Sequence, residues 1–231
     1  ENQIATLKGN LPFGNFIFKP TFSFQRNHRQ AANPGESRQV LPAAAAVDLI
    51  LDVYTGRFEV ENVNLSNFSG TLGAEVKYYD HENIGAVPLQ PTGHFTNLAV
   101  FGFEEWEAEK LTLNFGARFD YRLQKFLASA TNPLLPQNDE RDYSSVSGAI
   151  GAAYKLSSAL TATANIGRGF RTPSFYNLYV YGYHGGVFAF QIGDPDLKNE
   201  TSLDVSGSLR LRSQRFEATA TVFQNRIDNY I

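Results

Sequence analysis

Cysteine and methionine are both missing from the 231-residue sequence. Without cysteine, the chain has no disulfide bond, no zinc site built on thiolates and no cysteine nucleophile. It begins at Glu1 without a basic stretch followed by an apolar run, so no secretory signal peptide is visible. We therefore expect the chain to be a processed protein or an internal piece of a longer one.

Long apolar runs and a strong charge of either sign are missing as well. No stretch approaches the roughly 18 consecutive apolar residues of a membrane-spanning helix, although strands that cross a membrane need apolar residues only at alternate positions. Twenty lysines and arginines against 23 aspartates and glutamates give a net charge of −3. That balance offers no electrostatic footprint for nucleic acid, so we expect no nucleic-acid partner.

What the chain does have is a hydrophobic pattern with a period of two residues. In the segment 109–122, one face carries apolar side chains and the other carries mostly polar ones. The apolar face comprises Leu111, Leu113, Phe115, Ala117, Phe119 and Tyr121. This alternation is typical of a half-buried β-strand. Similar segments predict ten strands, at residues 4–9, 16–27, 47–60, 68–80, 95–106, 109–122, 143–156, 159–168, 202–212 and 215–229.

The connections between these segments alternate between short and long. The long ones cover residues 28–46, 81–94, 123–142 and 169–201. An up-and-down antiparallel sheet places successive connections at opposite ends, so one end should carry tight turns and the other large loops. Short periplasmic turns and longer extracellular loops are the pattern of a transmembrane β-barrel. We therefore predict an all-β, antiparallel, up-and-down transmembrane β-barrel.

A soluble antiparallel sandwich or lipocalin-like barrel would show the same alternation, because it also has one apolar face. Strand length and aromatic placement favour the membrane barrel. Several segments hold the pattern for ten or more residues, close to the ~9–11 that a tilted strand needs to cross a bilayer. Aromatic residues lie toward strand ends, as interfacial girdles require, at Tyr78, Tyr79, Trp106, Tyr121, Tyr154, Phe170 and Tyr230.

Two segments depart from the clean pattern. Pro20 interrupts the apolar face of 16–27, and a proline within a strand is expected at a bulge or an edge-like irregularity. The segment 95–106 is partly apolar on both faces, with Phe101 opposite Val100. We expect that segment to contain a bulge or to pack its inner face on another part of the protein.

Two stretches that flank the longest connection resemble a known family. Residues 166–179 read IGRGFRTPSFYNLY, and residues 193–202 read GDPDLKNETS. They are similar to the GFRxPSxxxLY and GNPxLKPExS elements of TonB-dependent outer-membrane receptors, except that Asn199 stands where the family usually has proline. FGFEEW at 101–106 and LNFGARFD at 113–120 resemble the family's paired strands that end in an RYD-type sequence.

The resemblance, which runs over most of residues 68–231, implies an architecture and partners. Receptors of this family have a 22-stranded barrel, a plug domain inside it and an energy-coupling box before the plug. We therefore expect residues 1–231 to be a partial barrel domain of about ten strands, without the plug, the coupling box or the C-terminal strands. The implied location is the bacterial outer membrane. The implied partners are membrane lipid, the plug, the TonB complex reached through the plug, and an iron-complex ligand such as a ferric siderophore or haem.

The loop 178–192 supplies the candidate ligand contacts, which are Tyr181, Tyr183, His184 and Phe188. An aromatic-rich extracellular loop suits the capture of a planar or catecholate ligand by stacking, with His184 as a candidate ligand to a metal or haem iron. The alternative is that the aromatic residues belong to an ordinary interfacial girdle and that the lone histidine is not a ligand.

Arg171 and Glu200 are the candidate plug contacts. Arg171 lies in the segment 170–173, which we expect to turn inward at the outer rim as a shelf against the plug. Alternatively, Pro173 merely ends the strand and Phe170 marks the membrane interface. The family's plugs present arginines to barrel glutamates, which implies such a contact for Glu200. The alternative for Glu200 is a solvated lumenal charge.

Three other functions compete with an active-transport receptor. A passive porin-type or adhesin-type barrel would conduct without a plug, and a soluble ligand-binding β-barrel would need no membrane. An enzyme has the least support, because the sequence shows neither a catalytic triad nor an acid pair. We expect no catalytic residue, no cofactor and no metal site, since the resemblance implies that the motive force comes from elsewhere.

Overall fold

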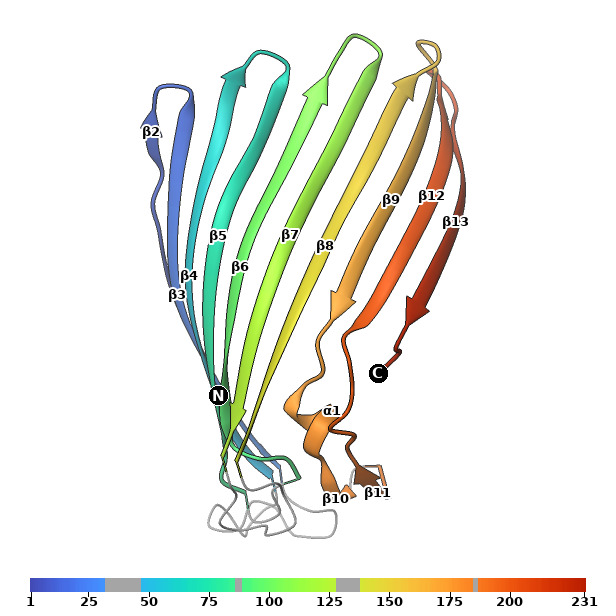
Figure 1. Ribbon diagram of the computed structural model, residues 1–231. Helices are drawn as coiled ribbons and strands as arrows, with labels where there is room; N and C mark the ends of the chain where they lie inside the picture. Colours follow the sequence, from blue (N-terminus) through green and yellow to red (C-terminus); the bar gives the residue numbers. More distant parts are fainter. Residues whose placement is uncertain (32–46, 86–88, 128–137, 185–186) are drawn as a thin grey trace.

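Eleven antiparallel strands form one large sheet in the computed structural model, which describes residues 1–31, 47–85, 89–127, 138–184 and 187–231 (Figure 1). The strand order is β1-β3-β4-β5-β6-β7-β8-β9-β12-β13, and β2 also pairs with β3. These strands are β1 (Asn2–Lys8), β2 (Leu11–Phe13), β3 (Phe16–Ala31), β4 (Val47–Leu65), β5 (Phe68–Asn83), β6 (Gly93–Glu107), β7 (Leu111–Phe126), β8 (Asp139–Lys155), β9 (Leu160–Arg171), β12 (Glu200–Arg212) and β13 (Glu217–Asp228). A separate hairpin joins β10 (Tyr181–His184) to β11 (Ala189–Ile192), and the helix α1 covers Phe175–Tyr179.

All ten predicted strands are present, so the all-β antiparallel fold is confirmed. From β3 onward, the strands of the large sheet have 12 to 19 residues, more than the ~9–11 needed to cross a bilayer. The sheet is open, because β1 and β13 lie at its two edges and do not pair with each other within the described residues. The sequence did not predict β2, α1 or the β10–β11 hairpin.

Short turns lie at one end of the sheet, and α1 and the β10–β11 hairpin lie at the other (Figure 1). Serine side chains close two of these turns. The hydroxyl of Ser157 accepts hydrogen bonds from the backbone N–H groups of Ala159 and Leu160, at 3.2 and 3.1 Å. The hydroxyl of Ser213 accepts one from Phe216 at 3.2 Å. Such side-chain bonds stabilise tight turns, which accounts for the short connections at this end.

Pro20 lies where the edge pairing of β3 is interrupted. β1 pairs with β3 as far as Thr21, and β2 resumes the pairing at Phe18. Between these positions, the carbonyl of Pro20 accepts a hydrogen bond from the N–H of Gly9 at 2.9 Å. A proline cannot donate to a strand ladder, so the break falls where no donor is required. The predicted edge-like irregularity is therefore confirmed.

The large sheet has an apolar face and a polar face, and the apolar face forms a band of defined width. On β5 the band runs from Phe68 to Tyr78. Ten residue steps at about 3.4 Å, tilted by about 40°, span about 26 Å, which matches the ~25 Å apolar band of membrane barrels. The rings of Phe24, Tyr54 and Tyr78 follow one another across three strands at the end of the band, with centroids 5.1 and 6.3 Å apart. We call these three residues the outer girdle.

Beyond the outer girdle the two faces exchange character. On the previously apolar side, the guanidinium of Arg26 pairs with the carboxylate of Asp52 at 2.5 Å. On the previously polar side, Phe126 is buried, with 1% of its surface exposed. Alternation therefore continues past the band with the sides reversed. This reversal explains why β7 continues to Phe126, whereas the sequence pattern predicts its end at residue 122.

β6 carries no bulge, because its register with both neighbours is continuous. Its polar-side aromatic residues are instead covered by other side chains. The guanidinium groups of Arg57 and Arg118 lie 4.6 and 5.4 Å from the ring centroid of Phe101, within cation–π range. The ring of Phe95 packs against Phe175 of α1, with centroids 5.8 Å apart. The second expectation for this segment, that its inner face packs on other parts of the protein, is confirmed.

Candidate functional site

A buried hydrophobic cluster joins α1 to the polar face of the sheet, beyond the outer girdle. Phe126, Phe175, Leu178 and Tyr179 form this cluster, and Phe95 packs against it. The ring of Phe175 meets the rings of Phe95 and Phe126 edge-on, each at 5.8 Å. Edge-to-face geometry is the arrangement that aromatic pairs prefer. Because the cluster removes large apolar side chains from water, it holds α1 against β6 and β7.

The sequence before α1 explains where the helix begins. Ser174 is the N-cap residue: its hydroxyl accepts the N–H of Asn177 at 3.2 Å, and the side chain of Asn177 accepts the N–H of Ser174 at 3.1 Å. This reciprocal arrangement is a capping box. The carbonyl of Pro173 accepts a hydrogen bond at 3.1 Å from the buried amide of Gln124 on β7. The chain after β9 therefore turns onto the polar face and is fixed there.

The GDPD sequence fixes the other end of this segment. The N–H of Gly193 donates to the carbonyl of Val180 at 2.7 Å. A Cβ atom at position 193 would lie 2.6 Å from the carbonyl carbon of Leu178, so only glycine permits this close approach. The side chain of Asp194 accepts the N–H of Asp196 at 2.8 Å, as in an Asx turn. The two motifs thus fix the two ends of this segment, at Pro173 and at Gly193.

Two of the candidate ligand contacts share one face of the β10–β11 hairpin. Tyr181 pairs with Ile192 and Tyr183 with Phe190, so these four side chains lie on the same side. The rings of Tyr181 and Phe190 meet edge-on at 5.1 Å. More than half of the surface of Tyr183, Phe190 and Ile192 is exposed. Exposed apolar clusters of this kind are common at binding surfaces. We call these four residues the aromatic face of the hairpin.

His184 lies on the opposite face of the hairpin. Its Nδ1 atom is 2.9 Å from the amide oxygen of Gln191 and 3.1 Å from the hydroxyl of Tyr176. Burial raises the pKa of Tyr176, so its hydroxyl stays protonated at neutral pH and donates to Gln191. A proton on Nδ1 of His184 would leave Nε2 as the free acceptor. This face borders a cavity of about 230 Å³, lined also by Arg29, Val47, Leu49, Asn83, Leu89 and Gln90.

Phe188 lies in the turn of the hairpin. Its φ angle is +51°, in the left-handed region that non-glycine residues adopt rarely, and 75% of its surface is exposed. The structure thus groups Tyr181 with Tyr183, places Phe188 at the tip and puts His184 on the other side. The four candidate ligand contacts therefore do not form a single cluster. They are divided between an aromatic surface and a polar surface of the hairpin.

The candidate plug contacts Arg171 and Glu200 are brought together. They are direct cross-strand partners on β9 and β12, and Arg171 Nη1 lies 3.8 Å from the carboxylate of Glu200. Glu200 also accepts the N–H of Ile231 at 2.9 Å, and Arg171 donates to the carbonyl of Ile231 at 3.2 Å. The side chain of Arg171 is half exposed, whereas that of Glu200 is largely buried.

Sequence reasoning did not identify several polar residues beside this pair. A cavity of about 250 Å³ lies on the polar face, lined by Asn97, Asp120, Arg122, Tyr143, Ser145, Phe170, Arg171 and Thr172. The guanidinium of Arg122 donates to the side chain of Asn97 at 2.7 Å and lies 4.8 Å from the centroid of Phe95. Alternation alone places Arg122 on the polar face, but it gives no sign that Arg171 lies beside it.

The sequence alone gives Tyr176 no role and includes Tyr179 only among the aromatic residues of the loop 178–192. Burial, together with a hydrogen bond of 3.1 Å to Asp139, raises the pKa of Tyr179. In the described ranges, no three acidic or histidine side chains lie close enough together to hold a metal ion. None of the helices in those ranges has the length and apolar character to cross a membrane.

A family model for the β-barrel of TonB-dependent receptors matches residues 4–231. The chain therefore belongs to the TonB-dependent receptor-like β-barrel family, and the family resemblance seen in the sequence is confirmed. The family and the solved structures similar to this chain are outer-membrane β-barrel transport receptors, not enzymes.

Solved structures with the same fold include receptors for several cargoes. The copper transporter OprC is 17% identical, with a TM-score of 0.73, over 99% of this chain and 39% of its own. The Serratia marcescens hemophore receptor HasR, solved as a double mutant with HasA and heme, is 15% identical, with a TM-score of 0.70, over 99% and 40%. The ferric-catecholate import receptor Fiu from E. coli K12 is 13% identical, with a TM-score of 0.69, over 99% and 41%. The chain thus spans about two fifths of each structure. No curated protein sequence matches it.

Membership of this family indicates which face of the sheet contacts lipid and which face lines the lumen. In membrane barrels the apolar face contacts lipid and the polar face lines the lumen. The short turns then mark the periplasmic end, and α1 with the β10–β11 hairpin marks the outer end. The candidate ligand contacts and the Arg171–Glu200 pair both lie at this outer end of the barrel wall (Figure 1).

Proposed function

We propose that this protein is an outer-membrane active-transport receptor for an iron complex, a ferric siderophore or haem, energised by the TonB complex through a plug domain. The observation that carries the proposal is the aromatic face of the hairpin, which is exposed and held at the outer end of a barrel wall of this family. Aromatic rings stack well on planar groups such as porphyrins and catechols. An iron complex that carries planar groups is therefore the cargo that this surface suits best.

The names of the similar structures support the same class of cargo. They include a hemophore receptor in complex with heme, a ferric-catecholate import receptor and a siderophore receptor, PiuA from Acinetobacter baumannii. OprC is a copper transporter. At identities of 11 to 17%, these likenesses support the fold and do not choose among the cargoes.

The two surfaces of the hairpin suggest two different roles in cargo binding. Tyr181, Tyr183 and Phe188 would stack on the cargo, because the first two share the aromatic face and the third is exposed at the tip. His184 would act from the other surface, where it already shares hydrogen bonds with Tyr176. Its free imidazole nitrogen could accept a hydrogen bond or coordinate a metal.

We also propose that Arg171 and Glu200 contact the plug. A largely buried carboxylate on the lumen side needs a cationic partner, and Arg171 at 3.8 Å supplies only a long ion pair. A plug arginine could therefore add a shorter contact to Glu200. The plug domain would belong to a part of the protein outside the 231 residues.

Uptake of radiolabelled iron complexes tests the proposal. The full-length protein would be expressed in a strain that lacks its own iron receptors, with and without a functional TonB complex. We expect uptake of at least one ferric siderophore or of haem, and we expect it to disappear without TonB. Uptake that does not depend on TonB, or a large steady conductance of the intact protein in a planar bilayer, would contradict the proposal and favour a passive barrel.

A matched pair of variants tests the hairpin itself. Phe188→Ala removes an exposed ring at the outer end, and Phe216→Ala removes an exposed ring from a periplasmic turn. Loss of one stacking ring costs about 1 kcal/mol, so we expect Phe188→Ala to weaken cargo binding about fivefold. Phe216→Ala should leave it unchanged. Equal cargo binding by both variants would show that the tip of the hairpin is not part of the binding site.

A further inference from the structure

The cavity of about 250 Å³ beside Arg171 contains a cation to which the proposed function gives no role. This cation is Arg122 of β7, whose side chain is partly buried. Its Nε atom donates to the side-chain oxygen of Asn97 at 2.7 Å, and its guanidinium lies over the ring of Phe95, 4.8 Å from the centroid. These two contacts hold the guanidinium in place. Its terminal nitrogens, Nη1 and Nη2, have no hydrogen bond to any residue that the structure describes.

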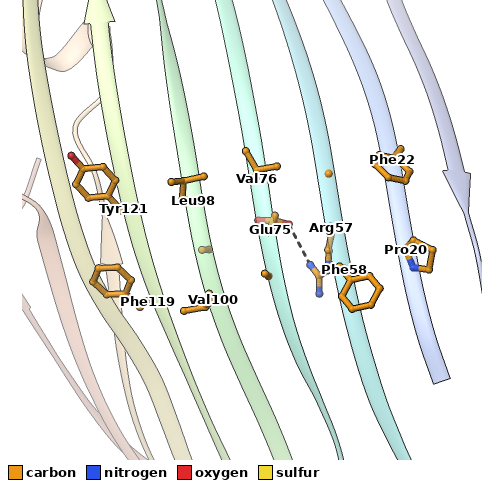
Figure 2. Close-up of a pocket in the computed structure, with 13 residues that line it drawn as sticks. Pro20, Phe22, Arg57, Phe58, Glu75, Val76, Leu98, Val100, Phe119 and Tyr121 are labelled. Carbon is orange, nitrogen blue, oxygen red and sulfur yellow. Dashed lines mark hydrogen bonds and ion pairs between the residues drawn. The ribbon is translucent and has the colours of Figure 1, made fainter. Parts of the chain in front are cut away.

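Three other cations on the lumen-facing side of β4 to β7 have a carboxylate partner. Arg57 lies 3.5 Å from the carboxylate of Glu75 (Figure 2). The same carboxylate lies 2.9 Å from Arg118 and 3.2 Å from Lys77. Arg122 differs from these three, because no carboxylate in the described ranges lies within ion-pair distance of it.

The other charged groups of the cavity are already paired. Asp120 lines the cavity, but its carboxylate binds Arg118 at 2.9 Å. Arg171 lines it as well and has Glu200 at 3.8 Å. The positive charge that remains without a partner in this cavity is therefore that of Arg122.

A carboxylate fits the free end of this guanidinium. Two terminal nitrogens form a fork that pairs with both oxygens of a carboxylate through parallel hydrogen bonds. The hydroxyl groups of Ser145 and Thr172 line the same cavity and can donate further hydrogen bonds to an anion. A partly buried guanidinium without an anionic partner is unfavourable, because the charge has lost water and gained nothing in return.

The size of the cavity favours a side chain over the cargo as the source of this carboxylate. Sites for drug-sized ligands have volumes of about 300–1,000 Å³, and ferric siderophores and haem are of that size or larger. The cavity, at about 250 Å³, is smaller. It also lies beside the Arg171–Glu200 pair, which the proposed function assigns to contact with the plug.

We propose that an aspartate or glutamate side chain of the plug enters this cavity and binds Arg122. The inference rests on the plug in the proposed function, and it adds a second contact of opposite sign, because Glu200 is there the partner of a plug arginine. Two neighbouring contacts of opposite sign fix the register of the plug on the wall. A shifted plug would bring like charges together, which is unfavourable.

Zero-length cross-linking of the full-length protein tests this inference. Arg122→Lys places a primary amine in the cavity, and a water-soluble carbodiimide joins an amine to a carboxylate in direct contact with it. Mass spectrometry of the digested protein then identifies the carboxylate. We expect a cross-linked peptide that joins position 122 to one acidic residue of the plug and that is absent from wild type.

Arg118→Lys is the matched control, because the cation at position 118 already has partners in the barrel wall. Its amine should be joined to Glu75 or Asp120 and not to the plug. The proposal would be overturned if Arg122→Lys were joined only to barrel carboxylates, or to none while Arg118→Lys reacted.

Hydrogen exchange gives a second measurement that needs no cross-link. Arg122→Gln removes the charge, so exchange in one segment of the plug should become about tenfold faster, and Arg122→Lys should restore part of the protection. Heat-dependent gel mobility checks that the barrel of each variant is folded. Unchanged exchange throughout the plug of Arg122→Gln would contradict the proposal.

A free anion in the cavity is the alternative occupant. In that case inorganic phosphate would raise the melting temperature of wild type but not of Arg122→Gln, and plug exchange would be the same in both, which would overturn the proposal. None of these measurements uses an iron complex. A failure of iron uptake and a failure of this inference are therefore distinguishable.

Discussion

The lumen-facing side of the barrel wall contains two regions that differ in chemistry. Over β4 to β7 its side chains are charged and cross-linked. The carboxylate of Glu75 lies 2.9 Å from Arg118, 3.2 Å from Lys77 and 3.5 Å from Arg57, and Arg118 also binds Asp120 at 2.9 Å. Residues of three strands, β4, β5 and β7, are thereby joined by one network of ion pairs. We call this the charged region.

Over β8, β9 and β12 the lumen-facing side chains are small. A trough of about 550 Å³ lies here and reaches Phe101, Phe103, Asn114 and Arg118 on β6 and β7. Its small or short lumen-facing residues are Gly116, Ser147, Ala149, Gly151, Asn165, Gly167, Gly169, Ser202 and Asp204. Glycine leaves the backbone itself as the surface, so another chain can approach closely. The charged region satisfies its own charges, whereas the trough leaves space. We therefore expect the plug to come closest to the wall over the trough, beside Arg171 and Glu200.

Removing one charge should have a large effect in the charged region. Glu75→Gln keeps the size of the side chain and leaves Arg57 and Arg118 without their shared partner. Breaking a buried ion pair costs about 3–5 kcal/mol, and we expect about 2–3 kcal/mol here because the two arginines are about a third exposed. The measurement is the free energy of unfolding by guanidinium chloride in lipid vesicles.

Asp204→Asn is the matched change in the trough. Asp204 makes no ion pair with any residue that the structure describes, so its loss should change the free energy of unfolding by less than about 0.5 kcal/mol. Comparable losses of unfolding free energy from Glu75→Gln and Asp204→Asn would show that the charged region and the trough contribute equally to stability. That result would contradict the difference described between the two regions.

Filling the trough should affect transport more than stability. A Cβ atom at Gly167 would meet its nearest neighbour, Cβ of Ala149, at an ordinary 3.7 Å, so Gly167→Phe should leave the barrel folded. Its ring would occupy space that we assign to the plug. Overpacking costs about 1–3 kcal/mol, and about 1.4 kcal/mol corresponds to a factor of ten. We expect iron-complex uptake to fall about tenfold.

Gly207→Phe is the control for the trough. Gly207 lies on β12 and pairs with Ala164 of β9, on the lipid-facing side, and a Cβ atom there would also make only ordinary contact. Uptake by this variant should match wild type. Normal uptake by Gly167→Phe would show that the plug does not approach the wall here.

Much of the fold could be predicted from the sequence, because alternation is a local signal. The ten strands follow from it, and the clean pattern in 109–122 correctly assigns Arg118 and Asp120 to the polar face. Strand ends could not be predicted, because the faces exchange character beyond the outer girdle. Phe101 looked misplaced on the polar face, since nothing local reveals that Arg57 and Arg118 cover its ring.

The candidate site was less predictable, because its geometry depends on long-range contacts. The hairpin that separates His184 from Tyr183 exists only because residues 181–184 pair with 189–192, in a segment without a clear strand pattern. Likewise, the pairing of Arg171 with Glu200 depends on the register between β9 and β12 across a connection of 28 residues, positions 172 to 199. The motifs identified the segment but not how its residues meet.

The smallest effect is expected at the position where the chain departs from the family. The side chain of Asn199 donates to the carbonyl of Ser144 on β8 at 3.1 Å and also contacts Ser145, which ties the end of the hairpin segment to the trough side of the wall. Asn199→Pro restores the usual family residue but removes these bonds, at a cost of about 0.5–1.5 kcal/mol. Hydrogen exchange at Tyr181–Ile192 should become about fivefold faster.

Asn199→Ala separates the lost hydrogen bonds from the stiffness of proline. Both substitutions remove the amide donor, so both should accelerate exchange in the hairpin to a similar extent. Slower exchange in Asn199→Pro alone would mean that a rigid turn holds the segment better than the bonds to β8. In that case the attachment of the hairpin would depend on the turn itself. Neither substitution should alter the charged region, because the hydrogen bonds of Asn199 with described residues go to β8 and to Asn229, the residue after β13.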